Sequence, residues 1–152
     1  VNWRQQLGDF GYSIRAVLND YKQTITDFPN DTNNLNNYYV GQNLGEIYGY
    51  ETDGLFQTNE EATAYTDMVD QSFINGFVYE AGDLKYVDQN GDGAINNGSN
   101  TLGDSGDYKV IGNTTPRYQY GITLGFNYKN FDFNAFVQGV GKRDVNMVQG
   151  NY

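Results

Sequence analysis

One stretch decides the fold class of this chain: Tyr118-Gln119-Tyr120-Gly121-Ile122-Thr123-Leu124-Gly125-Phe126-Asn127-Tyr128. Its even positions carry aromatic or aliphatic side chains, and its odd positions carry small or polar ones. A period of two sustained over this length predicts a β-strand with one apolar face and one polar face. A tilted strand of about 9–11 residues is also long enough to cross a lipid bilayer.

Two further segments alternate in the same way. Their apolar positions are Phe10, Tyr12, Ile14, Ala16 and Leu18 in the first, and Phe131, Phe133, Ala135 and Val137 in the second. Only Lys129-Asn130 separates the last two strands, which predicts a two-residue hairpin turn. A short connection, Gln5 to Asp9, precedes the first strand, and a long stretch, roughly residues 27–114, follows it. The sequence therefore predicts an all-β chain with one long loop.

The composition narrows the classes of function. The 152 residues include 9 Lys+Arg and 19 Asp+Glu, which gives a net charge of −10, and there is no Cys and no His. A chain without cysteine has no disulfide, thiol nucleophile or cysteine-ligated metal. Without histidine it has no Ser-His-Asp triad, and no paired catalytic constellation takes its place, so we do not expect an enzyme. The acidic balance argues against nucleic-acid binding.

Two interpretations of the strands remain open at this point. The first is a segment of a large transmembrane antiparallel β-barrel, whose strands give only a weak hydropathy signal. The second is a soluble, calcium-stabilised β module that binds carbohydrate or another protein. Outer-membrane barrels join their strands by short periplasmic turns and long extracellular loops. The contrast between residues 27–114 and Lys129-Asn130 therefore favours the barrel.

The barrel interpretation makes two predictions about side chains. Tyr118, Tyr120, Ile122, Leu124 and Phe126 should face lipid, and Gln119, Thr123 and Asn127 should face the lumen. An aromatic girdle should form at the periplasmic interface from Phe10, Tyr12, Phe126, Tyr128, Phe131 and Phe133.

The long loop has features of a folded segment. Thr58, followed three residues later by Glu61, is a capping-box pattern that predicts a short helix through Ala62, Ala64 and Met68. Aromatic side chains between Gly45 and Phe56 could stack on sugar rings, although such residues more often pack a loop on itself. This apolar surface predicts that the loop is ordered.

One motif has the spacing of metal ligands. Residues 88–99 match the first half of an EF-hand-type calcium loop, with predicted ligands Asp88, Asn90, Asp92, the Ala94 carbonyl and Asn96 through water. Position 12 should be an acid and is Ser99, for which Asp104 or Asp107 could substitute if the loop folds back. The alternative is a turn held by its own Asx side chains. We expect a structural calcium ion.

Four segments carry a family resemblance: residues 44–56 (LGEIYGYETDGLF), 81–95 (AGDLKYVDQNGDGAI), 111–121 (IGNTTPRYQYG) and 131–144 (FDFNAFVQGVGKRD). In this order they resemble the SusC/RagA-type TonB-dependent outer-membrane transporters. The chain departs from the family pattern at Ala81, where proline is common, and at Ser99, where an acid would complete the calcium loop.

The resemblance implies a barrel of about 22 strands closed by an N-terminal plug. It implies import of oligosaccharides or peptides across the outer membrane of a Gram-negative bacterium, powered through TonB by parts outside this chain. A SusD-like surface lipoprotein would act as the partner.

Under this resemblance the chain divides into four parts. Residues 1–26 are a strand end, a periplasmic turn and a barrel strand, and residues 27–114 are an extracellular loop. Residues 115–147 are a barrel hairpin, and residues 148–152 begin the next extracellular loop.

Overall fold

The computed structural model describes residues 1–76 and 78–145. The chain forms two compact units, and each is described by itself. The sheet unit consists of residues 1–22 and of the chain from Thr114 onward, and the loop unit consists of residues 23–113. The predicted start of a further loop at 148–152 lies outside the described residues.

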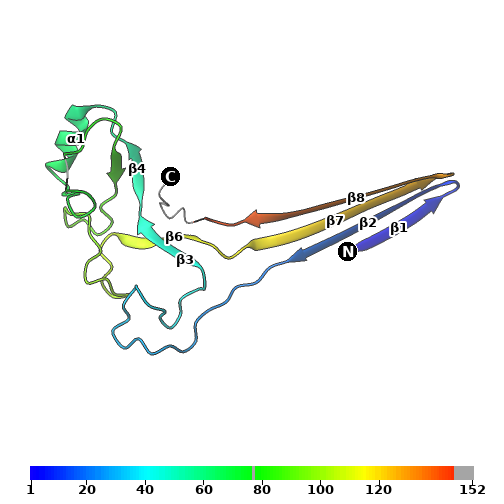
Figure 1. Cartoon of the computed structure of the whole chain (residues 1–152), viewed down its shortest axis with the longest axis horizontal. Coiled ribbons are helices and arrows are strands. Elements are labelled where there is room, and N and C mark those ends of the chain that lie inside the picture. Colours follow the sequence, from blue (N-terminus) through cyan, green and yellow to red (C-terminus); the bar gives the residue numbers. More distant parts are fainter. Residues whose placement is uncertain (77, 146–152) are drawn as a thin grey trace, which may run out of the picture. The chain divides into compact units, whose positions relative to one another are not determined.

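The sheet unit is a four-stranded antiparallel sheet in the order β1-β2-β7-β8. Its strands are β1 (Asn2–Leu7), β2 (Phe10–Asn19), β7 (Arg117–Tyr128) and β8 (Phe131–Lys142), which lie side by side in Figure 1. The three alternating segments are confirmed as strands, and the last extends beyond the predicted pattern. The four strands form an open sheet, with β1 and β8 at its two edges.

The connection before β2 is shorter than the sequence indicated. Gln5, Gln6 and Leu7 belong to β1, so the prediction of a connection from Gln5 to Asp9 was wrong. Leu7 pairs with Phe10, which leaves Gly8-Asp9 as a two-residue turn. Gly8 has φ of 61°, a left-handed conformation that suits glycine at a tight hairpin. The predicted turn at Lys129-Asn130 is confirmed, since Tyr128 pairs with Phe131.

The register of the strands separates two kinds of side chain. Partners across an antiparallel pair lie on the same face of the sheet, and Leu124 pairs with Ile14 on β2 and with Ala135 on β8. The apolar face is thus made of Phe10, Tyr12, Ile14, Ala16 and Leu18, of Tyr120, Ile122, Leu124, Phe126 and Tyr128, and of Phe131, Phe133, Ala135 and Val137. The polar face includes Ser13, Arg15, Gln119, Thr123, Asn127, Asp132 and Asn134.

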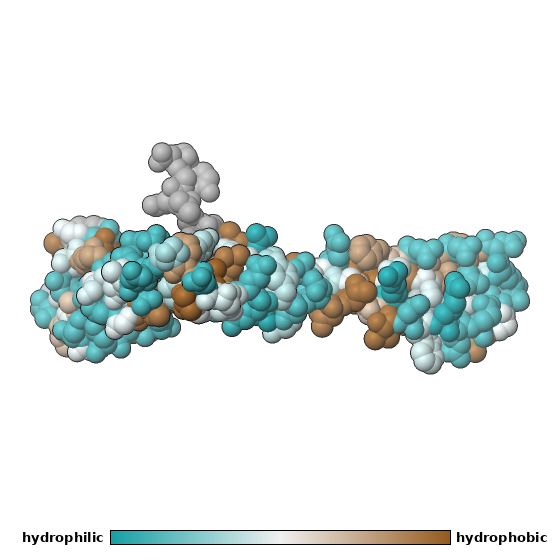
Figure 2. Space-filling view, turned by 90° about the horizontal axis from the view of Figure 1, so that it is seen from below, coloured by the Kyte–Doolittle hydropathy of each residue, from teal (hydrophilic) through white to brown (hydrophobic). Residues whose placement is uncertain are grey.

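Much of the apolar face is open to solvent within this chain. The exposed large side chains include Leu18, Leu124 and Phe133. In Figure 2, hydrophobic side chains (brown) over the sheet strands reach the surface. Monomeric soluble proteins rarely leave such a face open, so a covering environment is required.

The aromatic residues at the turn end of the sheet form one cluster. Phe126 lies at its centre, with ring centroids 6.4 Å from Phe10, 6.1 Å from Phe131 and 4.9 Å from Phe133, the last ring stacked. Phe10 also lies 6.2 Å from Tyr12. The predicted gathering of these rings at one level is confirmed, and their place at a membrane interface remains a prediction.

The far end of the alternating stretch is less regular than its sequence. Tyr118 has φ of 55°, which is unusual for a bulky side chain, so the strand is distorted there. The next aromatic residue, Tyr120, lies over Gly139 on β8. A Cβ at position 139 would meet the Tyr120 hydroxyl at 2.5 Å, so a larger residue there would displace the Tyr120 ring.

The loop unit contains two small antiparallel sheets and a helix. Strand β3 (Glu46–Tyr50) pairs with β6 (Tyr108–Asn113), and β4 (Thr52–Leu55) pairs with β5 (Leu84–Tyr86). Helix α1 (Asn59–Thr66) begins after Thr58, whose hydroxyl accepts the Glu61 N–H at 3.1 Å. Glu61 in turn accepts the N–H of Gln57, the residue before the cap, at 2.9 Å, whereas in a standard capping box it would accept the N–H of the cap residue itself. The helix is confirmed, although it ends before Met68, which is 70% exposed.

The loop unit has its own core. Phe56, Ala62 and Tyr79 pack together with Tyr65 against them, and Ile95 is fully buried elsewhere in the unit. The loop unit is thus a folded body, as its aromatic content predicted. No helix among the described residues is long and apolar enough to cross a membrane.

Substitution of Leu124 tests which face of the sheet meets lipid. Leu124→Arg should lower the free energy of unfolding of the full-length protein by roughly 2–4 kcal/mol, because arginine would replace an apolar side chain near the bilayer midplane. Denaturant titration in detergent or lipid measures the loss. Thr123→Arg is the matched control on the polar face and should cost much less. An equal cost at both positions would contradict the assignment of faces.

Candidate functional site

The predicted calcium ligands lie together in one tight loop of the loop unit. Asp88 begins the loop, and its carboxylate oxygens accept the N–H groups of Gly91 at 2.7 Å and Gly93 at 2.9 Å. These glycines have φ of 76° and 81°, in the left-handed region that other residues adopt only with strain. The Asp88 carboxylate therefore folds the chain back toward its own starting point.

The remaining side chains repeat this pattern. Asn90 Oδ1 accepts the Asp92 N–H at 3.0 Å, and Asp92 Oδ1 accepts the Ala94 N–H at 2.8 Å. Asn96 donates its side-chain amide to the Ala94 carbonyl at 3.1 Å. The bonds to Asn90 and Asp92 are successive Asx turns, and all three bonds hold the loop through its own side chains. The structure thus contains the hydrogen bonds of a turn held by its own Asx side chains, which was the alternative to a calcium loop. Calcium binding remains a prediction.

The loop offers oxygen ligands of the kind that calcium binds, but few of them are carboxylates. Carboxylate, amide and carbonyl oxygens are the donors that calcium takes. The Asn90 side-chain amide, and after it the Ala94 N–H, hold the pKa of Asp92 below its usual range, so this carboxylate stays anionic. Within residues 1–76 and 78–145, however, no three acidic side chains are placed together to hold a metal ion.

The two acids considered as substitutes for position 12 have other partners. Asp104 Oδ2 accepts the N–H of Ser99 at 3.0 Å and its hydroxyl at 2.5 Å. Asp107 is buried and accepts the backbone N–H groups of Gln89 and Asn96. Ser99 therefore lies in a second small turn built around Asp104.

The chain at Asp70 anchors the C-terminal part of the loop. The Asp70 N–H donates to the Gly93 carbonyl at 2.8 Å, and the Ile95 N–H donates to the Asp70 carbonyl at 2.7 Å. These two bonds form a parallel bridge that carries Ile95 into the interior, where its exposure is 0%. The buried side chain of Ile95 therefore anchors one end of the loop, and the turn itself stays exposed.

A polar network joins the loop to both small sheets. Lys109 on β6 contacts Glu51 and donates to Gln89 Oε1 at 3.0 Å, and Gln89 also donates to Glu51 at 2.8 Å. The Lys109 hydrogen bond is the main reason that the pKa of Glu51 lies below its usual range.

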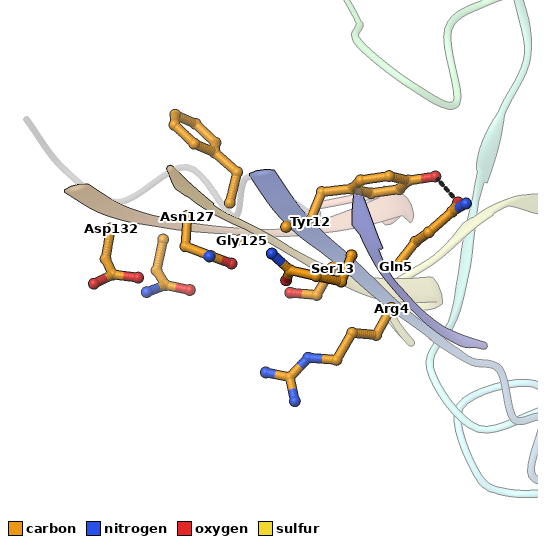
Figure 3. Close-up of a pocket in the computed structure, with 11 residues that line it drawn as sticks. Arg4, Gln5, Tyr12, Ser13, Gly125, Asn127 and Asp132 are labelled. Atoms are coloured by element: carbon orange, nitrogen blue, oxygen red, sulfur yellow. Dashed lines mark hydrogen bonds between the residues drawn. The ribbon is translucent and has the colours of Figure 1, made fainter. Parts of the chain in front are cut away.

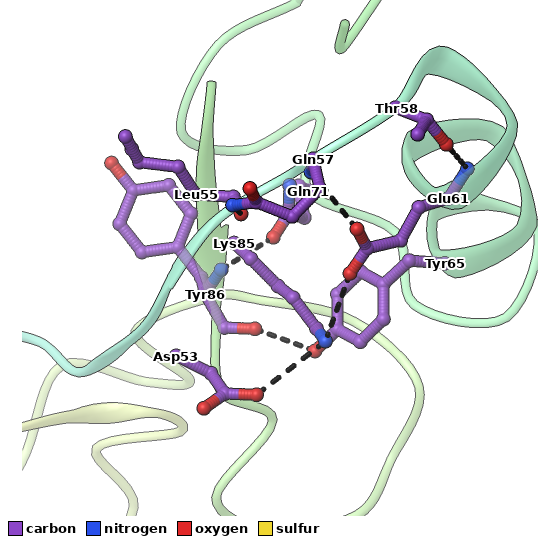
Figure 4. Close-up of polar contacts among 9 residues, drawn as sticks. All are labelled: Asp53, Leu55, Gln57, Thr58, Glu61, Tyr65, Gln71, Lys85 and Tyr86. Atoms are coloured by element: carbon purple, nitrogen blue, oxygen red, sulfur yellow. Dashed lines mark hydrogen bonds and ion pairs between the residues drawn. The ribbon is translucent and has the colours of Figure 1, made fainter. Parts of the chain in front are cut away.

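A second lysine holds α1 against β4 and β5. Lys85 lies 3.4 Å from Asp53 and 3.6 Å from Glu61, and its ammonium is 5.1 Å from the centre of the Tyr65 ring (Figure 4). Tyr65 donates its hydroxyl to the Tyr86 carbonyl at 2.5 Å. Glu61, in the first turn of the helix, thus contributes both to the helix start and to this ion pair.

The loop unit is strongly acidic. Most of the acidic residues of the chain lie in residues 23–113, whereas the basic residues in this range are Lys85 and Lys109. Both lysines form ion pairs inside the unit. The field of the unit therefore favours cations over anions.

The polar face of the sheet unit has a small concavity near the turns. About 150 Å³ of open space lies among Arg4, Gln6, Ser13, Asn127, Asp132 and Asn134. Figure 3 shows Ser13, Asn127 and Asp132 on one side of the strands, whereas Tyr12 lies on the other side and donates to Gln5 at 2.7 Å. The lining is polar on a face predicted to point into a lumen.

Sequence reasoning identified the loop but missed what holds it. The roles of Gln89 and Lys109 depend on pairings between segments that are distant in the sequence. Asp107 was predicted only as a possible calcium ligand. The acidic stretch from Glu80 to Asp107 indicated only a solvated loop, and no signal in it pointed to Lys109 as a partner.

Comparisons with known proteins found a similarity to a TonB-dependent receptor. No family model matches the chain. TonB-dependent receptor P3 of Formosa agariphila is 33% identical over 100 residues, which cover 64% of this chain and 8% of that receptor. This chain therefore corresponds to a small part of the length of that relative. The similarity supports a relation to TonB-dependent transporters in general.

The Glu51–Lys109 contact predicts a dependence on pH. Because the pKa of Glu51 is lower in the folded loop, the pair stabilises the unit above the ordinary pKa of 4.5, and this contribution is lost as pH falls below it. Lys109→Met should therefore increase proteolysis within residues 23–113 more strongly at pH 7 than near pH 3, where only its hydrogen bond to Gln89 is lost. Lys22→Met, outside the loop unit, is the control. An equal effect of Lys109→Met at both pH values would contradict this role.

Proposed function

We propose that this chain is part of a TonB-dependent outer-membrane importer of the SusC/RagA type. The observation that carries the proposal is the open sheet with one continuous apolar face, taken together with the similarity to a TonB-dependent receptor. In this account the sheet unit contributes adjacent strands to a barrel wall. Further strands pair with the edges of β1 and β8, which removes exposed sheet edges.

In this proposal the two units differ in composition because they lie in different surroundings. The apolar face lies against outer-membrane lipid, the aromatic cluster lies at the periplasmic interface, and the loop unit lies outside the cell. The turns at Gly8-Asp9 and Lys129-Asn130 are at the same end of the sheet and face the periplasm. A water-soluble β module would need another way to cover the apolar face.

Cell fractionation of the full-length protein tests the location. The protein should remain in the detergent-resistant outer-membrane fraction, and it should migrate differently on a denaturing gel before and after boiling, as intact barrels do. Recovery in a soluble fraction would overturn the proposal and favour the soluble calcium-stabilised module.

We further propose that the loop unit contacts a SusD-like surface lipoprotein and that the importer carries oligosaccharides or peptides. Purification of the full-length protein from outer membranes should recover a surface lipoprotein. Replacement of residues 27–114 by a short polar turn should weaken that recovery while the barrel remains intact. Recovery of the lipoprotein at wild-type yield would contradict a contact through this unit.

Uptake experiments test the cargo. A deletion strain should lose growth on particular oligosaccharides or peptides, and the full-length gene should restore it. Normal growth on all such nutrients would contradict the import proposal without affecting the assignment to the membrane.

We propose, finally, that Asp88, Asn90, Asp92, the Ala94 carbonyl and Asn96 hold a structural calcium ion. The loop contributes two carboxylates, so the dissociation constant should lie near 10⁻⁴–10⁻³ M, roughly the range of extracellular sites. Magnesium is less suited, because it requires near-ideal octahedral geometry.

Chelation tests the calcium proposal. A chelator should increase proteolysis of the loop in the wild-type full-length protein. Asp92→Ala should give the same increase without chelator. Asp31→Ala, an acid of the loop unit outside the motif, should leave the response to chelator unchanged. Identical cleavage in all conditions would discard the site and leave an Asx-stabilised turn.

A further inference from the structure

Asp107 is the buried charged side chain of the described residues, with an exposure of 1%. Transfer of a carboxylate out of water is costly unless hydrogen bonds or a counter-charge compensate for it. The ion pairs found among the described residues involve Lys85, Lys109 and Arg117, and none includes Asp107. The groups that compensate its charge must therefore be hydrogen-bond donors.

Those donors come from the two ends of the predicted calcium loop. Asp107 Oδ1 accepts the N–H of Gln89 at 2.6 Å, and Oδ2 accepts the N–H of Asn96 at 3.0 Å. The Asp107 N–H donates to the Asn96 carbonyl at 2.8 Å. Gln89 directly follows the first residue of the motif, and Asn96 is its position 9, so a single carboxylate joins both ends.

We propose that Asp107 is the positioning residue that closes the 88–96 loop, in place of the acid that is absent from position 12. In an EF-hand-type loop the acid at position 12 closes the loop by ligating the ion. Here closure comes from hydrogen bonds to the backbone and does not require an ion. If the loop opened, Asp107 would be left buried without donors, which links its burial to the closed form.

The proposed closure of the loop is independent of the calcium proposal, but one consequence of the closure depends on calcium binding. A loop held closed in advance presents its oxygens without an ordering cost on binding. Loss of Asp107 should therefore weaken calcium binding even though all five predicted ligands are unchanged.

Hydrogen exchange in the full-length protein with chelator present tests the closure. Asp107→Ala should accelerate exchange of the Gln89 and Asn96 amides by about tenfold or more, since charge-assisted hydrogen bonds are lost. Asp107→Asn preserves the shape and one acceptor oxygen, so it should keep the unit folded and accelerate one of the two amides. Asp104→Asn is the matched control: it should affect the turn around Ser99 and leave the Gln89 and Asn96 amides unchanged.

Two results would overturn the closure: wild-type exchange at both amides in Asp107→Ala, or wild-type exchange at both in Asp107→Asn if Asp107→Ala does not fold. A calcium titration of the same proteins separates the two proposals. Weaker binding in Asp107→Asn but not in Asp104→Asn supports positioning. Absence of binding in the wild type overturns the calcium proposal and leaves the closure to be decided by exchange.

Discussion

The register of the sheet is the constraint on which the rest of the structure depends. A shift of one residue between β2 and β7 would exchange their two faces, because the side-chain period of a strand is two. The observed register places Ile14, Leu124 and Ala135 in one row, and the row beside it contains Arg15 and Thr123, with Phe136 as an apolar exception. The two short turns hold this register at one end. One environment must therefore be apolar and the other polar.

The loop unit is stabilised in a different way. It has a small aromatic core, and much of its remaining order comes from side chains that bond to the backbone. Asp88, Asp104 and Asp107 each accept bonds from turns, and Lys85 and Lys109 join segments that are distant in the sequence. Because most of these groups are anionic or amides, the unit can be ordered and still strongly acidic. An ordered, acidic loop unit of this kind is compatible with a surrounding solution that contains cations.

The sequence predicted features that depend on local pattern. The strands at 10–18 and 118–128, the turn at Lys129-Asn130 and the helix cap at Thr58 follow from periodicity and from neighbouring residues. The pairing of β3 with β6 could not be predicted, because about sixty residues separate the strands and no period connects them. The resemblance placed the end of a strand before the first turn, but the extent of β1 was missed because Asn2–Leu7 is mostly polar. The function of Asp107 was missed for a similar reason, because its bonds are to backbone groups that carry no sequence signal.

The central claim is that the apolar face lies against lipid, and cysteine labelling tests it most directly. The chain contains no cysteine, so single cysteines can be placed at successive positions from 119 to 128 without background from this segment. Each would carry a fluorophore in the full-length protein in membranes, exposed in turn to a lipid-soluble and a water-soluble quencher. The account predicts that even positions respond to the lipid quencher and odd positions to the aqueous one. Uniform aqueous quenching, or shielding of the even positions from both quenchers, would contradict it.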